Sequence, residues 1–466
     1  MEKSRNIYYV CFLAMVAALG GFLFGYDTAV ISGTISRVSA QFGLGTMEQG
    51  WYVGCALVGS IAGVLVAGWL SDRYGRKKMM LLSAVLFSLS AIGCALSGTF
   101  TTLVIYRIIG GVGIGVVSIV SPMYISEVAL SHIRGSLVAL YQLAITVGFL
   151  GAYLVNFKIL GIAQAGKYGG SGWTERLWEE EWRAMLGTEA FPAVLFLVII
   201  IFIPESPRWL VMQGMTLRAR HIFSRIVQSD EQAIVMTGEI QKGETSRSLA
   251  ASLKILANPK ILLPVFLGVA LAMLGQFMGV NAVLYYGPSI FEQSGLSGGD
   301  ALYYQVWVGL VNVLTTVLAL CIIDRVGRKK LVYFGVTGMI GALLCISLYF
   351  YKGEAWQISS GILLGLFLFY VFATAISISA VIFVLLSEMY PNSIRGLAMS
   401  LAGLSLWVGT YLVGQLTPWL LETLRPAGTF LFFGIMCLPY LYLMWKYIPE
   451  TARKSLEDIE AYWMKK

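Results

Sequence analysis

Twelve long apolar runs dominate this chain of 466 residues and leave few folds open to it. Each run is long enough for a helix to cross the hydrocarbon core of a bilayer, which takes about 20 residues. The runs are continuous rather than alternating, so they predict transmembrane helices and exclude a β-barrel. The predicted spans are 7–31, 49–70, 79–98, 101–123, 136–157, 184–203, 261–292, 302–323, 331–350, 358–387, 397–421 and 427–448.

The composition agrees with a membrane protein and weighs against other classes. Hydrophobic residues make up 58% of the chain and charged residues 12%, whereas soluble domains carry about 25% charge. The net charge of +8 could suggest a nucleic-acid ligand, but the basic residues lie between the apolar runs, where the rule for membrane loops explains them. We therefore expect a lipid bilayer and no nucleic acid as a partner. All six cysteines lie inside the runs, so a disulfide framework is not expected.

Lysine and arginine also predict the topology. If both termini are cytoplasmic, the inside segments hold 25 of the 33 basic residues and the outside segments hold 7. Without the polar stretch at 204–260 the split is still 17 to 7. Cytoplasmic loops are enriched in Lys and Arg, so both termini are predicted to be cytoplasmic.

The polar stretch at 204–260 divides the apolar runs into two sets of six. It mixes charged residues with apolar ones such as Ile222 and Phe223, a pattern that predicts short amphipathic helices at the membrane surface. The predicted parts are an N-terminal six-helix half, a cytoplasmic linker, a C-terminal six-helix half and a short cytoplasmic tail. They correspond to residues 1–203, 204–260, 261–448 and 449–466.

Three motifs recur in the same order in the two halves. The first motif follows the second span and ends in Gly-Arg-Lys-Lys. The second motif follows the fourth span and has an arginine seven residues after a glutamate. The third motif begins with Pro-Glu at the end of the sixth span. A duplicated six-helix unit predicts two pseudo-repeats, which is the architecture of alternating-access transporters. The motifs lie at 68–78 and 324–330, at 126–135 and 387–396, and at 204–206 and 449–451.

The chain resembles the sugar porter family of the major facilitator superfamily. The resemblance rests on these repeated motifs and on three further ones: Gly-Tyr-Asp at 25–27, Arg-Ile-Ile-Gly-Gly at 107–111 and Gln-Phe at 276–277. The resemblance covers nearly the whole chain. The first and fourth spans are most similar to bacterial xylose–proton symporters. The resemblance implies the major facilitator fold and a monosaccharide as substrate.

Asp27 and Arg107 are charged residues placed well inside predicted spans. A charge at the centre of a spanning helix costs about 2.5–3.5 kcal/mol on insertion scales, so such residues persist where they pair or line an aqueous path. A fixed structural ion pair is one interpretation. The other is a proton site. A low dielectric makes a carboxyl group hold its proton more tightly and a nearby arginine makes it release the proton more readily, so a change in their balance can load or unload the proton. The resemblance favours the proton site, since proton-coupled members carry an Asp and an Arg in these spans and passive carriers lack the Asp.

Uncharged amides inside the spans are candidates for sugar binding. An amide can both donate to and accept from a hydroxyl group without the desolvation cost of a charge. Hydrogen bonding between helices is the alternative for each of them. The resemblance implies sugar contacts for Gln142, Gln276, Asn281 and Asn312. Gln276 and Asn281 would not share one face of an unbroken helix, so we expect an interruption near Gly279.

Four aromatic residues match family positions near the sugar, and packing is the alternative for each: Phe24, Tyr285, Phe383 and Trp407. Other positions depart from the family pattern. Gly275 stands in place of the first of two glutamines, Phe149 in place of a second amide, and Leu406 in place of a polar residue. The Gly-Pro-x-x-Trp motif of the tenth span is replaced at 379–383. These losses leave the identity of the sugar open.

Charged residues at the predicted cytoplasmic helix ends form the last group. Taken singly, each would be read as a solvated charge. Their repetition in both halves predicts salt-bridge networks that latch the inside face, a two-state element of the kind that gating requires. The residues are Arg76, Glu127, Arg134, Arg328, Glu388 and Arg395.

The sequence thus predicts proton-coupled uptake of a monosaccharide, a xylose-like pentose or a hexose, by alternating access. A passive sugar uniporter and a non-transporting sugar sensor are the alternatives. No metal cluster, phosphate loop or nucleophile arrangement is present in the sequence, so neither an enzyme nor a cofactor is expected. The expected ligands are a sugar and a proton, the expected state is a monomer, and the expected location is a bacterial inner membrane.

Overall fold

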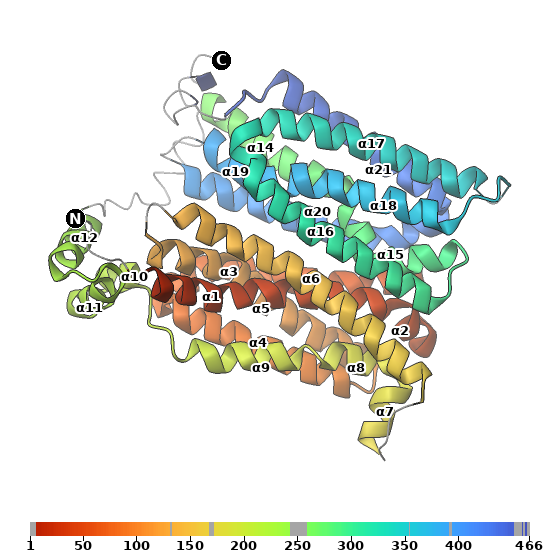
Figure 1. Ribbon diagram of the computed structural model, residues 1–466, viewed down its shortest axis with the longest axis horizontal. Coiled ribbons are helices and arrows are strands. Elements are labelled where there is room, and N and C mark those ends of the chain that lie inside the picture. The colour runs from red at the N-terminus through yellow and green to blue at the C-terminus, as the bar shows by residue number, and fades with distance from the viewer. Residues whose placement is uncertain are drawn as a thin grey trace. The chain divides into compact units, whose positions relative to one another are not determined.

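The structure, a computed structural model, describes residues 6–130, 133–166, 172–242, 259–353, 355–390, 394–451, 459, 462 and 463. Twelve segments in this part of the chain are helical, long and apolar enough to span a membrane, and these residues include no strand (Figure 1). The predicted helical class and number of spans are thereby confirmed. The segments are Ile7–Gly33, Thr46–Tyr74, Arg76–Leu96, Phe100–Val128, Arg134–Gln164, Glu181–Ile200, Ile261–Gln293, Gly298–Ile323, Arg328–Lys352, Ser360–Met389, Arg395–Thr423 and Arg425–Lys446.

The chain forms two compact units. The first comprises Met1–Val30, Val58–Val155 and Ile162–Ser246, and the second comprises Ile31–Leu57, Asn156–Gly161 and Arg247–Lys466. The boundary between them therefore does not follow the linker alone, because residues Ile31–Leu57 cluster with the second unit. The predicted division into an N-terminal half, linker, C-terminal half and tail stays a prediction.

The first unit contains most of the N-terminal helices. α1 packs against α5, and α5 against α4. Close approach of α1 and α6 depends on glycine: a Cβ added to Gly148 would collide with the carbonyl oxygen of Phe22. The helices are α1 (Ile7–Val30), α3 (Thr46–Tyr74, from Val58 onward), α4 (Arg76–Leu96), α5 (Phe100–Val128), α6 (Arg134–Gln164, except its segment in the second unit), α7 (Trp173–Glu179), α8 (Glu181–Gly187) and α9 (Ala190–Ile200).

Three short helices follow α9, and they gather at the end of the first unit where α1 begins (Figure 1, left). They are α10 (Pro207–Met212), α11 (Thr216–Val227) and α12 (Asp230–Lys242). α11 is amphipathic because Ile222, Phe223 and Ile226 are buried while its basic residues are exposed. The rest of the predicted linker, residues 243–258, and most of the predicted tail lie outside the described residues.

The second unit contains the C-terminal helices. α14 packs against α20, and α17 packs against α18 and α21. A π-helical segment, Ala375–Ser379, interrupts the tenth span at the place where the sequence departs from the family's Gly-Pro motif. The elements are α2 (Ile35–Phe42), α14 (Pro259–Phe277), α15 (Val280–Gln293), α16 (Gly298–Val326), α17 (Arg328–Lys352), α18 (Ser360–Thr374), η2 (Ala375–Ser379), α19 (Ala380–Met389), α20 (Arg395–Thr423) and α21 (Arg425–Lys446), with η1 (Ile31–Gly33) and the first residues of α3.

Candidate functional site

Asp27 and Arg107 form a buried ion pair in the first unit. Asp27 lies in the last turn of α1, and Arg107 lies in α5. Arg107 Nη1 donates a hydrogen bond of 2.6 Å to Asp27 Oδ1, and the two side chains are only 2% and 1% exposed. The sequence predicted that these residues would act together, and the structure brings them together.

Glu189 is a third ionisable residue at this pair, and it is not among the site residues predicted from the sequence. It occupies the break between α8 and α9 and is 2% exposed. Its carboxyl group lies close to that of Asp27 and interacts with the charges of Asp27 and Arg107. One signal could have found it, because Glu189 is the single carboxylate within the predicted span 184–203.

The closeness of the carboxyl groups of Asp27 and Glu189 has a chemical consequence. Two ionised carboxylates can only accept, so a hydrogen bond between them requires one oxygen to carry a proton. With that proton, one negative charge faces the one positive charge of Arg107. Without it, the buried group of three carries a net negative charge, which a low-dielectric environment strongly disfavours. The arrangement can therefore hold and release one proton.

A neighbouring contact holds both carboxyl groups in place. The hydroxyl groups of Tyr26 and Thr188, the residues that precede Asp27 and Glu189, are hydrogen-bonded at 2.8 Å. This bond ties the end of α1 to the break between α8 and α9. The two backbones that carry the carboxyl groups are thus fixed to one another.

The second unit contains a cluster of three polar side chains built on Gln276. Gln276 Oε1 accepts hydrogen bonds from Asn281 Nδ2 at 2.8 Å and from Thr410 Oγ1 at 3.1 Å, and the single proton of the Thr410 hydroxyl is shared with the carbonyl oxygen of Leu406 at 2.9 Å. Because this oxygen already has two donors, the NH₂ group of Gln276 is the part left for a ligand oxygen. The structure brings Gln276 and Asn281 together as the sequence anticipated. Thr410 was missed, although its place one turn after Trp407 could have indicated it.

The predicted interruption near Gly279 is present. α14 ends at Phe277, α15 begins at Val280, and Gly279 between them has φ +89°. A Cβ at Gly279 would also lie 2.5 Å from the ring of Phe433, so both conformation and space require glycine here. Tyr370 Oη donates a 2.6 Å hydrogen bond to the carbonyl oxygen of Met278, which satisfies backbone freed by the break.

A second irregularity in α15 is supported by Gln305 of α16. Pro288 lacks the N–H that would bond the carbonyl group of Leu284 four residues earlier. Gln305 Nε2 donates to the carbonyl oxygens of Leu284 and Val283, at 3.2 and 3.3 Å. Gln305 is completely buried, so its amide acts as part of the helix backbone of α15.

The other predicted sugar-binding residues fall into two groups. In the second unit, Tyr285, Trp407 and Asn312 are 4%, 7% and 9% exposed, whereas Phe383 is 48% exposed and borders no described site. Tyr285 lies one turn after Asn281 on α15, and Trp407 lies on α20 before Thr410. In the first unit, Gln142 on α6 and Phe24 on α1 are partly buried.

The first repeated motif forms a charged network at the start of α4. Arg76 donates two hydrogen bonds of 3.1 Å to the carboxylate of Glu127. Glu205 accepts from the backbone N–H groups of Arg76 and Lys77, at 2.9 and 3.0 Å, where a carboxylate also complements the helix dipole. Burial raises the pKa of the Glu205 carboxyl group, and the hydrogen bonds from Lys77, Ser206 and Arg76 oppose this shift.

The second motif forms the same network at the start of α17. Arg328 Nη2 donates a 2.8 Å hydrogen bond to Glu388. Glu450 accepts from the backbone N–H groups of Arg328 and Lys329, both at 3.1 Å. The Glu of the Pro-Glu motif thus caps a helix in both units, a role that was not predicted from the sequence.

The remaining two predicted gating residues are arranged differently. Arg134 is exposed and forms no ion pair with any residue that the structure describes. Arg395 Nη2 donates to the carbonyl oxygen of Tyr390 at 3.2 Å. The structure therefore joins Arg76 with Glu127 and Arg328 with Glu388, and does not add Arg134 or Arg395 to these pairs.

Fold and site together define a class of protein. Buried ionisable groups inside spanning helices, an interrupted helix that carries polar amide side chains, and a duplicated set of spans are features of secondary transporters. The chain matches the family described as "Sugar (and other) transporter" over residues 13–463. It belongs to this family of sugar porters in the major facilitator superfamily, and it is an integral membrane protein.

Relatives and solved structures agree with this assignment. The chain is 36% identical to the arabinose-proton symporter of Bacillus subtilis (strain 168), over 100% of this chain and 97% of that protein. It is also 36% identical to the D-xylose-proton symporter of Escherichia coli (strain K12), over 99% and 97%. The inward-open structure of the xylose transporter XylE from E. coli matches with a TM-score of 0.82 and 35% identity, covering 98% of this chain and 100% of that one. These relatives are transporters and not enzymes, as the sequence predicted.

Proposed function

We propose that this protein is a symporter that couples the inward movement of a proton to the uptake of a monosaccharide, a xylose- or arabinose-like pentose or a hexose. The two buried, neighbouring carboxyl groups of Asp27 and Glu189, with Arg107 bonded to Asp27, are the observation that carries the proposal. A buried pair that needs one proton is a suitable carrier for proton coupling. The names of the relatives that are arabinose-proton and D-xylose-proton symporters support the substrate class.

The proton and the sugar have separate residues in this proposal. The carboxyl groups of Asp27 and Glu189 bind and release the proton as their access to water changes, while Arg107 keeps its positive charge beside them. The NH₂ group of Gln276 and the side chain of Asn281 donate to sugar hydroxyl groups. Tyr285 and Trp407 supply ring surface beside them, and Gln142, Asn312, Phe24 and Phe383 remain proposed contacts.

The wider context belongs to the same proposal. The protein acts as a monomer in a lipid bilayer, the bacterial inner membrane, with both termini cytoplasmic. The ion pairs of Arg76 with Glu127 and of Arg328 with Glu388 are latches that close in one state of the cycle. Arg134 and Arg395 are proposed to join these latches in that state.

A passive uniporter is the second candidate, since Asp27 and Arg107 could form a permanent structural ion pair. Glu189 weighs against this candidate. A structural pair needs one carboxylate for one guanidinium, and a second buried carboxyl group adds only cost.

Transport into proteoliposomes tests the proposal. Labelled D-xylose, L-arabinose and D-glucose are offered with and without an inward proton gradient. We expect accumulation above equilibrium only with the gradient, and Asp27→Asn should abolish accumulation while sugar exchange continues. If Asp27→Asn still accumulates sugar, Asp27 does not take part in the coupling step. If the wild type only equilibrates the sugar, with or without the gradient, the protein is a uniporter.

A further inference from the structure

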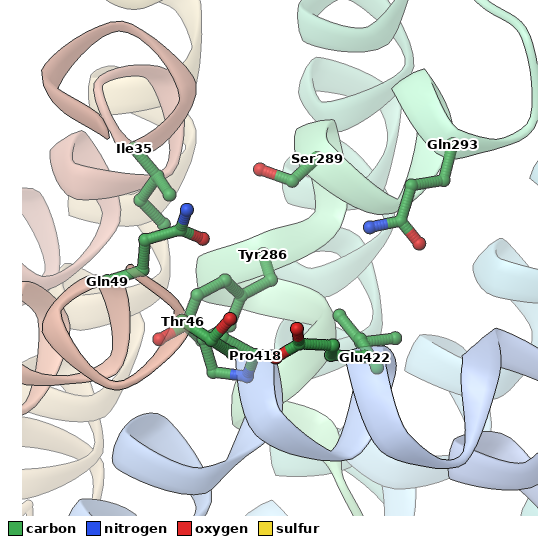
Figure 2. Close-up of a pocket in the computed structure, with 9 residues that line it drawn as sticks. Ile35, Thr46, Gln49, Tyr286, Ser289, Gln293, Pro418 and Glu422 are labelled. Carbon is green, nitrogen blue, oxygen red and sulfur yellow. The ribbon is translucent and has the colours of Figure 1, made fainter. Parts of the chain in front are cut away.

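A cavity of about 340 Å³ lies at the end of α15, on a different level of the second unit from Gln276. Figure 2 shows its walls, which come from the start of α2, the start of α3, the last turns of α15 and the end of α20. Sites for small ligands have volumes of about 300–1,000 Å³, so a molecule of monosaccharide size fits.

The polar groups of the cavity match the chemistry of hydroxyl groups. Within the described part of the chain, the side chains of Gln293, Glu422 and Thr46 have no hydrogen-bond partner. Gln49 uses one N–H toward the carbonyl oxygen of Leu44, at 3.4 Å, so its amide oxygen is available. Amide, hydroxyl and carboxylate groups together offer donors and acceptors, as each sugar hydroxyl requires. Glu422 is the only charged residue of the lining, so an anion is disfavoured.

The walls are held in place without a ligand. Ser36 Oγ on α2 donates a 2.8 Å hydrogen bond to Glu292 of α15. Tyr286 Oη on α15 donates a 2.6 Å hydrogen bond to the carbonyl oxygen of Gly414 on α20. These two bonds fix α2 and α20 against α15. A binding site formed before the ligand arrives loses less entropy on binding.

The cavity is distinct from the Gln276 cluster. Gln293 lies twelve residues after Asn281 on α15, and Glu422 lies twelve residues after Thr410 on α20. Twelve residues of α-helix span about 18 Å. The Tyr286–Gly414 hydrogen bond lies between the two levels, and Tyr286 itself lines the cavity. A single monosaccharide cannot reach both groups.

We propose that this cavity is a second binding site for a neutral monosaccharide, held by Gln293, Glu422, Thr46 and Gln49. The choice of sugar as the probe rests on the proposed function. The site itself goes beyond it, because symport requires only one sugar site. A sugar bound here contacts α3, α15 and α20 together, and so favours the arrangement in which these helices are adjacent.

Saturation-transfer NMR on the full-length protein in nanodiscs tests the second site. The probes are D-xylose, L-arabinose and D-glucose, and the background variant is Gln276→Ala, which weakens the first site. We expect a saturable signal that survives Gln276→Ala. Adding Gln293→Leu, which keeps the size but removes the hydrogen bonds, should weaken this remaining binding about five- to tenfold.

A bulky residue provides the sharper comparison. Thr46→Trp fills the cavity and should abolish the remaining signal. Met47→Trp adds the same bulk at an adjacent, exposed residue that does not line the cavity, and should leave the signal intact. Loss of all binding in Gln276→Ala alone overturns the second site while leaving the proposed transport function standing. The second site is also overturned if the remaining binding is unchanged in both Gln293→Leu and Thr46→Trp.

Discussion

The carboxyl groups of Asp27 and Glu189 lie buried and close to each other beside the guanidinium group of Arg107. The contact joins the end of α1 to the break between α8 and α9. It gives the coupling hypothesis a second carboxyl group to test, independent of Asp27.

Glu189→Gln should move the pH dependence of proton-driven sugar uptake to more acidic pH. The glutamine NH₂ group can donate to the Asp27 carboxylate permanently, so a hydrogen bond between the two side chains no longer needs an added proton. Uptake into proteoliposomes over a series of outside pH values measures the shift. Glu175→Gln on α7, an exposed acid, is the matched control and should leave the curve unchanged. A wild-type curve for Glu189→Gln would exclude Glu189 from coupling.

Gln276→Ala should weaken sugar binding by about 1–3 kcal/mol, which is roughly five- to more than a hundredfold in Kd. Gln276→Glu distinguishes the accepting role of the amide oxygen from the donating role of the NH₂ group. Glutamate still accepts from Asn281 and Thr410 but cannot donate, so we expect it to bind sugar at least as weakly as Gln276→Ala. Isothermal titration gives both affinities. Wild-type affinity in Gln276→Glu would contradict a donor role.

Gln305→Met should lower the melting temperature, because the carbonyl groups of Val283 and Leu284 lose their buried donor. The cost of stranding a buried polar group is about 1–3 kcal/mol. Pro288→Ala supplies the missing backbone N–H for Leu284. The combined variant should therefore be less destabilised than the sum of the single variants, which a double-mutant cycle of thermal unfolding measures. Strict additivity would show that Gln305 does not substitute for that N–H.

Glu388→Ala should shift the protein toward inward-open states more strongly than Arg134→Ala. Glu388 is bonded to Arg328, whereas Arg134 has no ion pair among the described residues. Removing a latch destabilises only the state in which the latch is closed. Cysteine labelling from the outside measures the shift, after the exposed Cys321 and Cys345 are replaced by serine. Equal or greater labelling of Glu388→Ala than of wild type would refute the latch.

The sequence by itself determined the features that depend on local composition. Long apolar runs identified the twelve spans, since a spanning helix must satisfy its own backbone. Asp27 and Arg107 were recognisable because a charge in such a run is costly. The break at Gly279 followed from the spacing of Gln276 and Asn281 on a helix.

Only the tertiary structure decided which helices are neighbours, and this determines which side chains of the site contact each other. Glu189 became a partner of Asp27 because α1 packs on α9. Thr410 bonds Gln276 because α14 packs on α20, and Gln305 reaches Leu284 because α15 packs on α16. No local pattern contains these pairings, since each joins residues far apart in the chain. The cavity at Gln293 and Glu422 has the same origin, because empty space between helices is a property of their packing.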